Sequence, residues 1–163
     1  MQTLEQLAAA AGHELERHRL QLATAESCTG GMVAMLMTAL AGSSVWFERG
    51  WVTYTNAAKE KELGVPASIF ADQGAVSEAC VLAMARGAIR ESRAHVSIAI
   101  SGIAGPAGGT EEKPVGTVWI AWGQKLGYAE ASCFHFAGDR QSVREQAASA
   151  ALEGLIKRLG RPG

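Results

Sequence analysis

The sequence predicts an α/β fold, a three-layer α/β/α sandwich built on a mixed, mainly parallel five-stranded sheet. Three observations lead to this prediction. Short apolar runs rich in β-branched and aromatic residues alternate with longer stretches that show helical spacing. A glycine-rich segment containing Gly30-Gly31 joins one apolar run directly to a helical stretch. Later in the chain, two apolar runs are separated by only five residues, which indicates an antiparallel hairpin.

The first half of the chain predicts strands and helices in alternation. Thr3 and Gln6 form a capping box for a helix with an apolar face that includes Leu7 and Leu15. Gly64, with Pro66 just beyond it, marks the end of the last helix of this half. The elements after the first helix are a strand over Leu20–Ala25, a helix over Met32–Leu40, a strand over Gly50–Thr55 and a helix over Asn56–Leu63.

The second half predicts two more helices and three more strands. Ser77 is a good N-cap for a helix that reaches about Ser92. A long Gly/Pro loop, Ser101–Gly116, separates a buried strand from the hairpin. The expected elements are strands over Val96–Ile100, Thr117–Trp122 and Tyr128–Phe136, a turn over Gly123–Gly127, and a final helix from about Asp139 to Gly160.

Length and composition predict one globular domain over residues 1–163. The 163 residues are 48% hydrophobic and 19% charged, with a formal net charge of −1. Lys and Arg are interleaved with Asp and Glu along the chain, so we expect no nucleic-acid partner. No apolar run approaches the roughly 20 residues that a membrane span needs, so we expect no membrane partner.

The cysteines and the first residues predict a cytoplasmic location. Cys28, Cys80 and Cys133 are odd in number and share no CxxC spacing, which argues against a disulfide framework and a zinc site. The segment Met1–Ala11 contains Glu5 in place of a basic region and has no long apolar stretch. It therefore does not have the features of a signal peptide.

Three loops at the expected carboxyl ends of strands carry the candidate chemistry: Glu26–Gly31, Thr55–Lys59 and Ser101–Gly116. They offer a serine hydroxyl, a lysine and glycine-rich backbone. The turn at Gly30-Gly31 opens a helix, whose N-terminus favours an oxyanion or a phosphate. The chain has no GxSxG elbow, no Walker A sequence and no GxGxxG, and none of its four histidines lies in these loops. A Ser-His-Asp triad is not expected.

A serine hydrolase without histidine needs another base, and a neutral lysine can serve. Lowering a lysine pKa from about 10.4 to near 7 costs roughly 4 kcal/mol, so such a lysine must be desolvated or lie near positive charge. On a helix, Lys59 shares a face with Leu63, whereas Lys61 lies about 200° around the axis. Lys59 is the candidate base, and Tyr54 is placed to hydrogen-bond it or to pass a proton.

Several motifs in this order resemble the carboxy-terminal domain family of the competence-damage-inducible protein CinA. The resemblance covers roughly residues 5–158, and several long motifs in register make it specific. They are Ala25-Glu26-Ser27-Cys28-Thr29-Gly30-Gly31, Gly42-Ser43-Ser44, Gly50-Trp51-Val52-Thr53-Tyr54 with Asn56 and Lys59, Gly74-Ala75-Val76-Ser77-Glu78, Ser101-Gly102-Ile103-Ala104-Gly105-Pro106 and Lys113-Pro114-Val115-Gly116.

The resemblance implies hydrolysis of the carboxamide of nicotinamide mononucleotide to nicotinate mononucleotide and ammonia, in a bacterial cytoplasmic enzyme of pyridine nucleotide recycling. It implies that Ser27 is the nucleophile, that Lys59 is the base, and that Tyr54 supports them. Ser101 stands where we expect many relatives to carry Thr. No metal or organic cofactor is expected, and the expected partner is a small nucleotide substrate.

On this interpretation Ser27 attacks the amide carbon while neutral Lys59 takes its proton, and protonated Lys59 then gives the proton to departing ammonia. The backbone N–H groups of Thr29, Gly30 and Gly31 are the expected oxyanion donors. The substrate phosphate is expected at the second glycine-rich loop or at a cation. The residues expected there are Ser101, Gly102, Gly105 and Arg140.

Two other functions remain open from the sequence. One is a non-catalytic nucleotide-binding or regulatory module, in which the two glycine-rich loops hold a phosphate and Ser27 only caps a helix. The other is an amidase for a different small carboxamide. Paired Trp residues on an expected edge hairpin favour a homodimer in either case. Separately, Glu26 is interpreted as a partner of the helix dipole and not as an acid catalyst.

Overall fold

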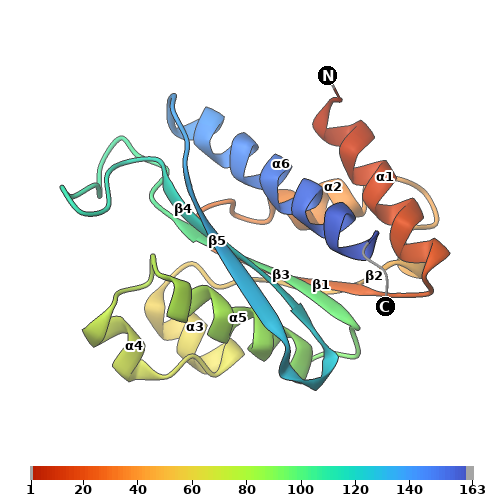
Figure 1. Ribbon diagram of the computed structural model, residues 1–163, viewed down its shortest axis with the longest axis horizontal. Helices are drawn as coiled ribbons and strands as arrows, with labels where there is room; N and C mark the ends of the chain where they lie inside the picture. Colours follow the sequence, from red (N-terminus) through yellow and green to blue (C-terminus); the bar gives the residue numbers. More distant parts are fainter. Residues whose placement is uncertain (1, 161–163) are drawn as a thin grey trace.

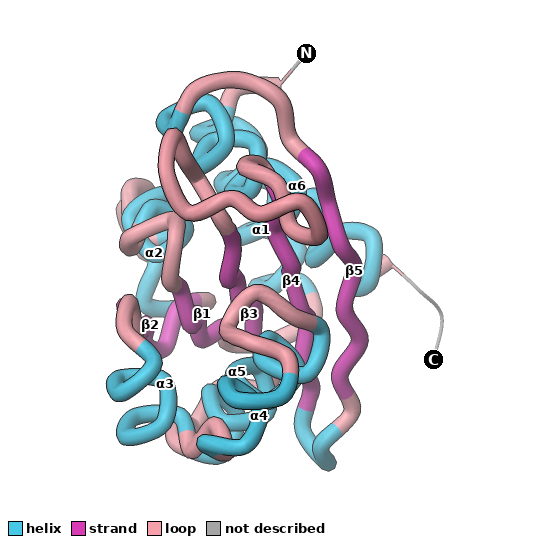
Figure 2. The backbone as a smooth tube through the Cα atoms, turned by 90° about the vertical axis from the view of Figure 1, so that its left-hand side faces the viewer, coloured by secondary structure: helices cyan, strands magenta, loops and turns pink. Residues whose placement is uncertain are grey.

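The computed structural model describes residues 2–160, which form one five-stranded sheet between two layers of helices (Figure 1). The strand order is β2-β1-β3-β4-β5, as seen across Figure 2. β1 pairs in parallel with β2 and β3, while β4 pairs antiparallel with both β3 and β5. Only β4 therefore runs against the other strands, and the predicted mixed α/β sandwich is confirmed. The strands are β1 (Leu22–Glu26), β2 (Phe47–Val52), β3 (Val96–Gly102), β4 (Thr117–Gln124) and β5 (Ala129–His135).

The two faces of the sheet are covered by different helices (Figure 1). On one face lie α1 (Leu4–Arg17), α2 (Met32–Met37) and α6 (Arg140–Leu159); on the other lie α3 (Asn56–Leu63), α4 (Ala67–Asp72) and α5 (Glu78–Arg90). Strand residues alternate accordingly. Large side chains such as Ile98 and Ile100 face α1 and α6, whereas small ones such as Ala99 and Ala121 face α5. The small residues let α5 pack close to the sheet.

Two elements differ from the sequence prediction by three residues at one or both ends, whereas the other predicted boundaries agree within two residues. The second strand was expected over 50–55, but β2 begins at Phe47 and ends at Val52. Its partner β1 ends at Glu26, which pairs with Val52, so the length of the neighbouring strand overrides the β-propensity of the residues beyond it. The helix expected to reach Leu40 ends at Met37, because the Thr38 hydroxyl donates to the Ala34 carbonyl and closes the last turn.

The helix that carries Lys59 has the predicted bounds. α3 begins after Thr55, whose hydroxyl accepts the Ala58 N–H, and ends at Gly64 in the left-handed conformation. The short helix α4 follows Pro66 and was not predicted. Its six residues are too few to show a helical repeat.

The tryptophans that favoured a homodimer do not lie on an exposed edge. Trp119 and Trp122 belong to β4, which is covered on one side by β3 and on the other by β5. Trp122 is buried beneath α6, where its indole N–H donates to the Ala151 carbonyl and the Arg158 guanidinium stacks on its ring. These side chains stabilise the fold and give no support to a dimer interface.

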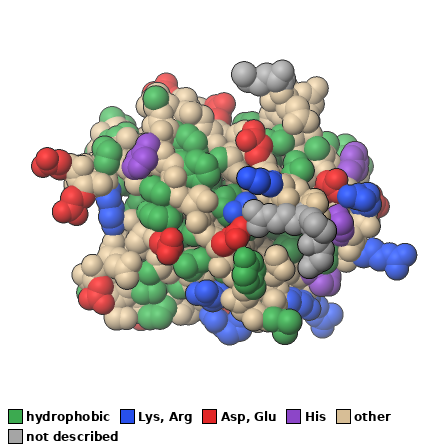
Figure 3. Space-filling model, viewed as in Figure 1, with side chains coloured by type: hydrophobic (Ala, Val, Ile, Leu, Met, Phe, Trp, Pro, Cys, Tyr) green, Lys and Arg blue, Asp and Glu red, His purple; other side chains and the backbone are tan. Residues whose placement is uncertain are grey.

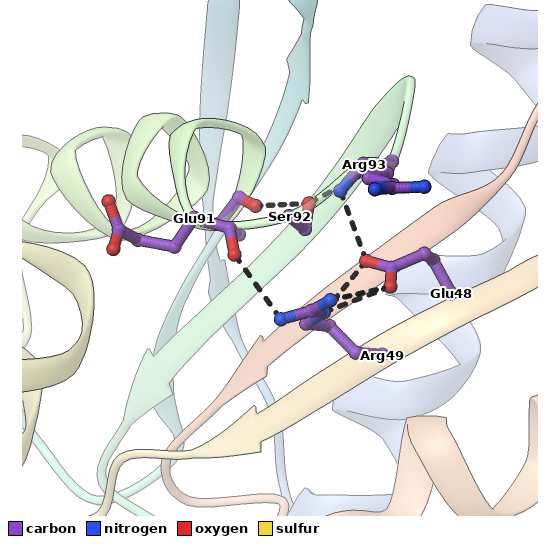
Figure 4. Close-up of polar contacts among 7 residues, drawn as sticks. Glu48, Arg49, Glu91, Ser92 and Arg93 are labelled. Atoms are coloured by element: carbon purple, nitrogen blue, oxygen red, sulfur yellow. Dashed lines mark hydrogen bonds and ion pairs between the residues drawn. The ribbon is translucent and has the colours of Figure 1, made fainter.

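A polar network at the amino-terminal end of the sheet connects the edge strand to the turn after α5 (Figure 4). The Glu48 carboxylate accepts hydrogen bonds from Arg49 and from the Arg93 N–H, and Arg49 also donates to the Glu91 carbonyl. The Arg49 guanidinium holds the pKa of Glu48 below its ordinary value. Because these groups are near solvent, the network contributes little to stability.

The rest of the surface carries mixed charge. Acidic and basic side chains are both scattered over the face drawn in Figure 3. Within residues 2–160, no helix is both long enough and apolar enough to cross a bilayer.

Candidate active site

The turn after β1 places Ser27 at the carboxyl end of the sheet, next to the ends of β2 and β3. Ser27 is 7% exposed, and its backbone N–H donates to the Ile100 carbonyl of β3. The next residues form a tight turn in which the Gly30 N–H donates back to the Ser27 carbonyl. Ser27 is thus held between two strands, with its side chain at the edge where parallel strands present functional groups.

Glu26 holds this turn from inside the protein. Its side chain is fully buried and accepts three hydrogen bonds: from the Thr29 hydroxyl at 2.6 Å, and from the Val33 and Ala34 N–H groups at 3.0 Å each. α2 has no side-chain cap at its N-cap residue, Gly31, so the Glu26 carboxylate supplies the missing acceptor. The group that accepts hydrogen bonds at the N-terminus of α2 is therefore a side chain of the protein itself.

This arrangement corrects one part of the sequence prediction. The Gly30 N–H was expected to bind an oxyanion, but it donates to Ser27 within the turn. Thr29 gives its hydroxyl to Glu26, and Gly31 is the N-cap of α2. These three residues shape the turn and do not line the cavity beside Ser27.

Lys59 reaches Ser27 from α3, which covers the other face of the sheet from α2. It is 1% exposed, and its Nζ lies 3.0 Å from Ser27 Oγ and 3.1 Å from the Tyr54 carbonyl oxygen. The inward face expected from the position of Leu63 is confirmed, because Leu63 is also buried. A serine hydroxyl and a lysine amine at hydrogen-bond distance have the geometry of a nucleophile and its base.

Burial lowers the pKa of Lys59 from its ordinary value of 10.5, because the charged ammonium loses its hydration. The same burial raises the pKa of the neighbouring Cys28 thiol to about 11. At neutral pH Cys28 therefore stays a protonated thiol and is a poor nucleophile. Of the two adjacent side chains, Ser27 is the one within hydrogen-bond distance of the Lys59 amine.

The lowered pKa of Lys59 predicts a pH-dependent stability difference between wild type and Lys59→Met. Between the folded pKa and 10.5, the unfolded chain holds a proton at Lys59 and the folded chain does not, so rising pH favours folding. The wild type should therefore gain free energy of unfolding relative to Lys59→Met as the pH rises from neutral to alkaline. Urea unfolding at several pH values measures this gain.

Lys61 provides the matched control on the same helix, because its side chain is exposed. The free energy of unfolding of Lys61→Met should change with pH in the same way as that of the wild type. If the free energy of unfolding of Lys59→Met also changed with pH in the same way as that of the wild type, burial would not lower the pKa of Lys59.

Tyr54 contributes through two different groups. Its main-chain carbonyl accepts from Lys59 Nζ and from the Ser27 hydroxyl, the latter at 3.3 Å. Its side chain is 55% exposed and turns away, and its hydroxyl accepts from Arg140 Nη2 at 3.0 Å. The contact that the sequence predicted between Tyr54 and the lysine exists, but the backbone makes it and the phenol does not.

A cavity of about 260 Å³ lies over the Ser27–Lys59 pair. It brings together the turn after β1, the start of α3 and the loop after β3. Arg140 at its rim donates to the Gly105 carbonyl at 2.8 Å and connects that loop to Tyr54. Ser101 is 2% exposed, and its hydroxyl has no hydrogen-bond partner among residues 2–160. The predicted residues that line the cavity are Ser27, Tyr54, Lys59, Ser101, Gly102, Gly105 and Arg140.

A larger hollow of about 640 Å³ lies at the amino-terminal ends of the parallel strands. It is lined by residues such as His95, Trp122 and Tyr128. The serine in its lining, Ser97, donates its hydroxyl to the Ala85 carbonyl and not to a lysine. Size alone therefore does not select the candidate site, which is defined by the 3.0 Å contact of Ser27 with Lys59.

Cys28, which adjoins Ser27 in the sequence, is a buried thiol that lines the cavity. One contribution to the site was missed from the sequence: Arg144 donates to the carbonyls of Cys28 and Thr29 from α6. The spacing of four residues between Arg140 and Arg144 was the available signal, because it puts both side chains on one helix face.

Comparison with known proteins identifies the family of this chain. The model of the family described as "CinA C-terminal domain" matches residues 4–159. The chain belongs to the CinA C-terminal domain family. Two members of this family resemble it over nearly their full length, and both carry the name "Nicotinamide-nucleotide amidohydrolase PncC". The Pseudomonas putida protein is 49% identical over 96% of this chain and 98% of its own, and the Escherichia coli K12 protein is 51% identical over 93% and 92%.

Solved structures of the CinA family show the same fold. A competence damage-inducible protein A from Klebsiella pneumoniae superimposes with a TM-score of 0.95 and 38% identity, covering 99% of this chain and all of that one. A competence/damage inducible protein from Agrobacterium tumefaciens gives 0.93 and 40% identity, with 99% and 100% coverage. The CinA domain also occurs in longer proteins, such as a CinA-like protein of Colwellia psychrerythraea, of which this chain matches 33%.

Proposed function

We propose that this member of the CinA family hydrolyses the carboxamide of nicotinamide mononucleotide, giving nicotinate mononucleotide and ammonia. The names of the Pseudomonas putida and Escherichia coli relatives support the reaction and the substrate class. The observation that carries the mechanism is the buried contact between Ser27 Oγ and Lys59 Nζ at 3.0 Å. It supplies a nucleophile and a base in a site without a nearby histidine.

In the acylation step, neutral Lys59 accepts the Ser27 hydroxyl proton as Oγ forms a bond to the carboxamide carbon. The carbonyl electron pair moves to oxygen and gives a tetrahedral oxyanion. When it returns, the carbon–nitrogen bond breaks, and protonated Lys59 gives its proton to the leaving nitrogen, which departs as ammonia. Ser27 is left as a nicotinoyl ester, and Lys59 is neutral again.

Deacylation repeats these steps with water in place of Ser27. Lys59 takes a proton from the water, whose oxygen attacks the ester carbon. Lys59 then returns the proton to Ser27 Oγ as the carbon–oxygen bond to serine breaks. The products are the carboxylic acid, which ionises at neutral pH, and the regenerated dyad.

We place the oxyanion against the backbone N–H of Cys28, the residue that follows the nucleophile. The Ser27 carbonyl, on the same peptide group, accepts the Gly30 N–H within the turn. Because carbonyl and N–H point in opposite directions on a planar peptide, the Cys28 N–H points away from the turn. The residue after the nucleophile has the same role in α/β-hydrolases. Thr29, Gly30 and Gly31 then act by fixing the turn.

The nucleotide part of the substrate would extend toward the rim of the cavity. Ser101 and Gly102 lie near the dyad, at the end of β3, and the Ser101 hydroxyl is available to the substrate. Arg140, which donates to the carbonyl of the buried Gly105, is exposed. A guanidinium at the rim suits a phosphate group. This placement puts the amide inside and the phosphate outside.

The Tyr54→Phe variant should separate binding from chemistry. It removes the hydroxyl that contacts Arg140 but keeps the main-chain carbonyl that contacts Lys59. We expect KM for nicotinamide mononucleotide to rise by a factor of about 3 to 10, the effect of one lost hydrogen bond, while kcat stays close to wild type. Steady-state kinetics measures both. A large fall in kcat with unchanged KM would instead mean that the phenol carries a proton.

The proposal is tested by incubating the purified chain with nicotinamide mononucleotide and following ammonia and nicotinate mononucleotide. Nicotinamide and nicotinamide riboside, which lack the phosphate, are the matched substrates. Product from the mononucleotide in preference to both supports the proposal. Product from another small carboxamide alone would identify a different amidase, and binding of the mononucleotide without product would identify a non-catalytic module.

We also infer a cytoplasmic location, supported by three cysteines that form no disulfide. The homodimer stays a prediction, which sedimentation velocity of the purified chain would test. Binding assays with DNA and with lipid vesicles would test the expected absence of nucleic-acid and membrane partners.

A further inference from the structure

Arg144 makes an unusual set of contacts for an arginine beside a catalytic turn. From α6, its Nε donates to the Cys28 carbonyl at 3.0 Å and its Nη2 to the Thr29 carbonyl at 3.3 Å. Its Nη1 donates to the Gln141 side chain at 3.2 Å. Among the ion pairs of residues 2–160, none involves Arg144. The guanidinium is thus directed to the two carbonyls that follow Ser27.

These contacts fix the orientation of the peptides after the nucleophile. The Ser27 carbonyl accepts the Gly30 N–H, and the next two carbonyls accept Arg144. Because each peptide group is planar, fixing its carbonyl also fixes its N–H. The planar fork of arginine can hold two carbonyls at once, which a lysine ammonium on a flexible stem cannot do as precisely.

The turn is therefore held from two sides. Glu26 accepts hydrogen bonds from Thr29 and the start of α2, while Arg144 donates to the opposite, carbonyl side. Gly30 fits this close approach, because it has a φ of +60° and a Cβ there would lie 3.0 Å from Arg144 Nη2. A carboxylate and a guanidinium leave the turn little freedom to move Ser27 away from Lys59.

α6 also connects this turn to the rim of the cavity. Arg140 and Arg144 are four residues apart and so lie on one helix face. Arg140 holds the Gly105 loop and the Tyr54 hydroxyl, while Arg144 holds the turn of Ser27. One helix face sets both the reacting end and the outer end of the site.

We propose that Arg144 is a positioning residue for the Ser27 nucleophile, acting through the carbonyls of Cys28 and Thr29. This proposal rests on the proposed function, in which Ser27 is acylated. Arg144 touches no substrate in this scheme, since it does not line the cavity. Its loss should lower the rate of the chemical step and leave substrate binding almost unchanged.

The test compares Arg144→Ala and Arg144→Lys with wild type in the hydrolysis of nicotinamide mononucleotide. We expect kcat of Arg144→Ala to fall by about 10²-fold, the effect of a misplacement near 1 Å, with KM close to wild type. The Arg144→Lys variant should recover only a small part of the kcat that Arg144→Ala loses. Free guanidinium ion at millimolar concentration should raise kcat of Arg144→Ala and not that of wild type.

Arg86→Ala is the matched control, because Arg86 also donates to a main-chain carbonyl, that of Gly127, away from the cavity. It should keep wild-type kcat. Thermal melting of each variant shows whether it is folded at the assay temperature. Wild-type kcat in Arg144→Ala, or a rise in KM that accounts for the whole loss, would overturn the proposal.

A second measurement keeps this result separate from the substrate assignment. A fluorophosphonate probe labels a reactive serine: a bond forms from Oγ to phosphorus, fluoride leaves, and the serine proton passes to the base. Wild type should be labelled at Ser27, and Arg144→Ala at least about 10-fold more slowly. If wild type is labelled but does not hydrolyse the nucleotide, only the substrate assignment fails. Equal labelling rates, or no labelling of wild type, would overturn the role of Arg144.

Discussion

Ser27→Ala and Lys59→Met should each lower kcat for nicotinamide mononucleotide by about 10⁴-fold or more, because nucleophile and base act as one unit. Without Oγ no acyl-enzyme forms, and without a neutral amine beside it the hydroxyl keeps its proton. The double variant should be little worse than either single variant. Ammonia release under substrate saturation measures kcat, and mass spectrometry of the intact chain detects the nicotinoyl ester.

Two variants of the same residue types serve as controls. Ser68→Ala, on exposed α4, and Lys61→Met, on α3, should both keep wild-type kcat. Undiminished product from Ser27→Ala would show that another group is the nucleophile. Full activity in Lys59→Met would remove the lysine from the mechanism while leaving Ser27 in place.

Glu26→Ala should cause the largest loss of stability among the substitutions considered. It removes the acceptor for three donors: the buried Thr29 hydroxyl, the buried Val33 N–H and the partly buried Ala34 N–H. Leaving buried donors unsatisfied costs about 1 to 3 kcal/mol each before relaxation, so we expect the free energy of unfolding to fall by about 3 kcal/mol. Urea unfolding monitored by circular dichroism measures this change.

Glu14→Ala is the surface control for this stability loss. The Glu14 carboxylate accepts from Arg17 at 2.9 Å, but both side chains are partly exposed, so the free energy of unfolding should change by less than about 1 kcal/mol. A comparable loss in the two variants would mean that the Glu26 contacts with the turn and α2 contribute no more than a surface ion pair.

Local patterns were sufficient to predict the helix that carries Lys59, the proposed base. Asn56–Leu63 is followed by a C-terminal glycine, Gly64, and the buried partner Leu63 fixes the direction of Lys59. These signals lie close to Lys59 in the sequence and do not depend on the rest of the chain. The order of helices and strands followed from similar local signals.

The contacts that complete the site could not be predicted in this way. Arg144 lies 116 residues after Cys28, and nothing in the local sequence shows that α6 crosses the turn of Ser27. The extent of β2 depends on β1, its partner in the sheet. For Glu26, the sequence indicated a partner of the helix dipole, but only the packing shows that its carboxylate occupies the N-terminus of α2.

The backbone of Tyr54 contacts Lys59 while its side chain contacts Arg140, and this separation has a consequence for how the site can change. Every amino acid has a main-chain carbonyl, so the acceptor that holds Lys59 does not depend on the residue type at position 54. Substitutions there can alter the outer end of the cavity, where the side chain meets Arg140, without removing that acceptor. Position 54 is therefore a natural starting point for directed evolution of new nucleotide or carboxamide preferences with the proposed catalytic pair, Ser27 and Lys59, unchanged.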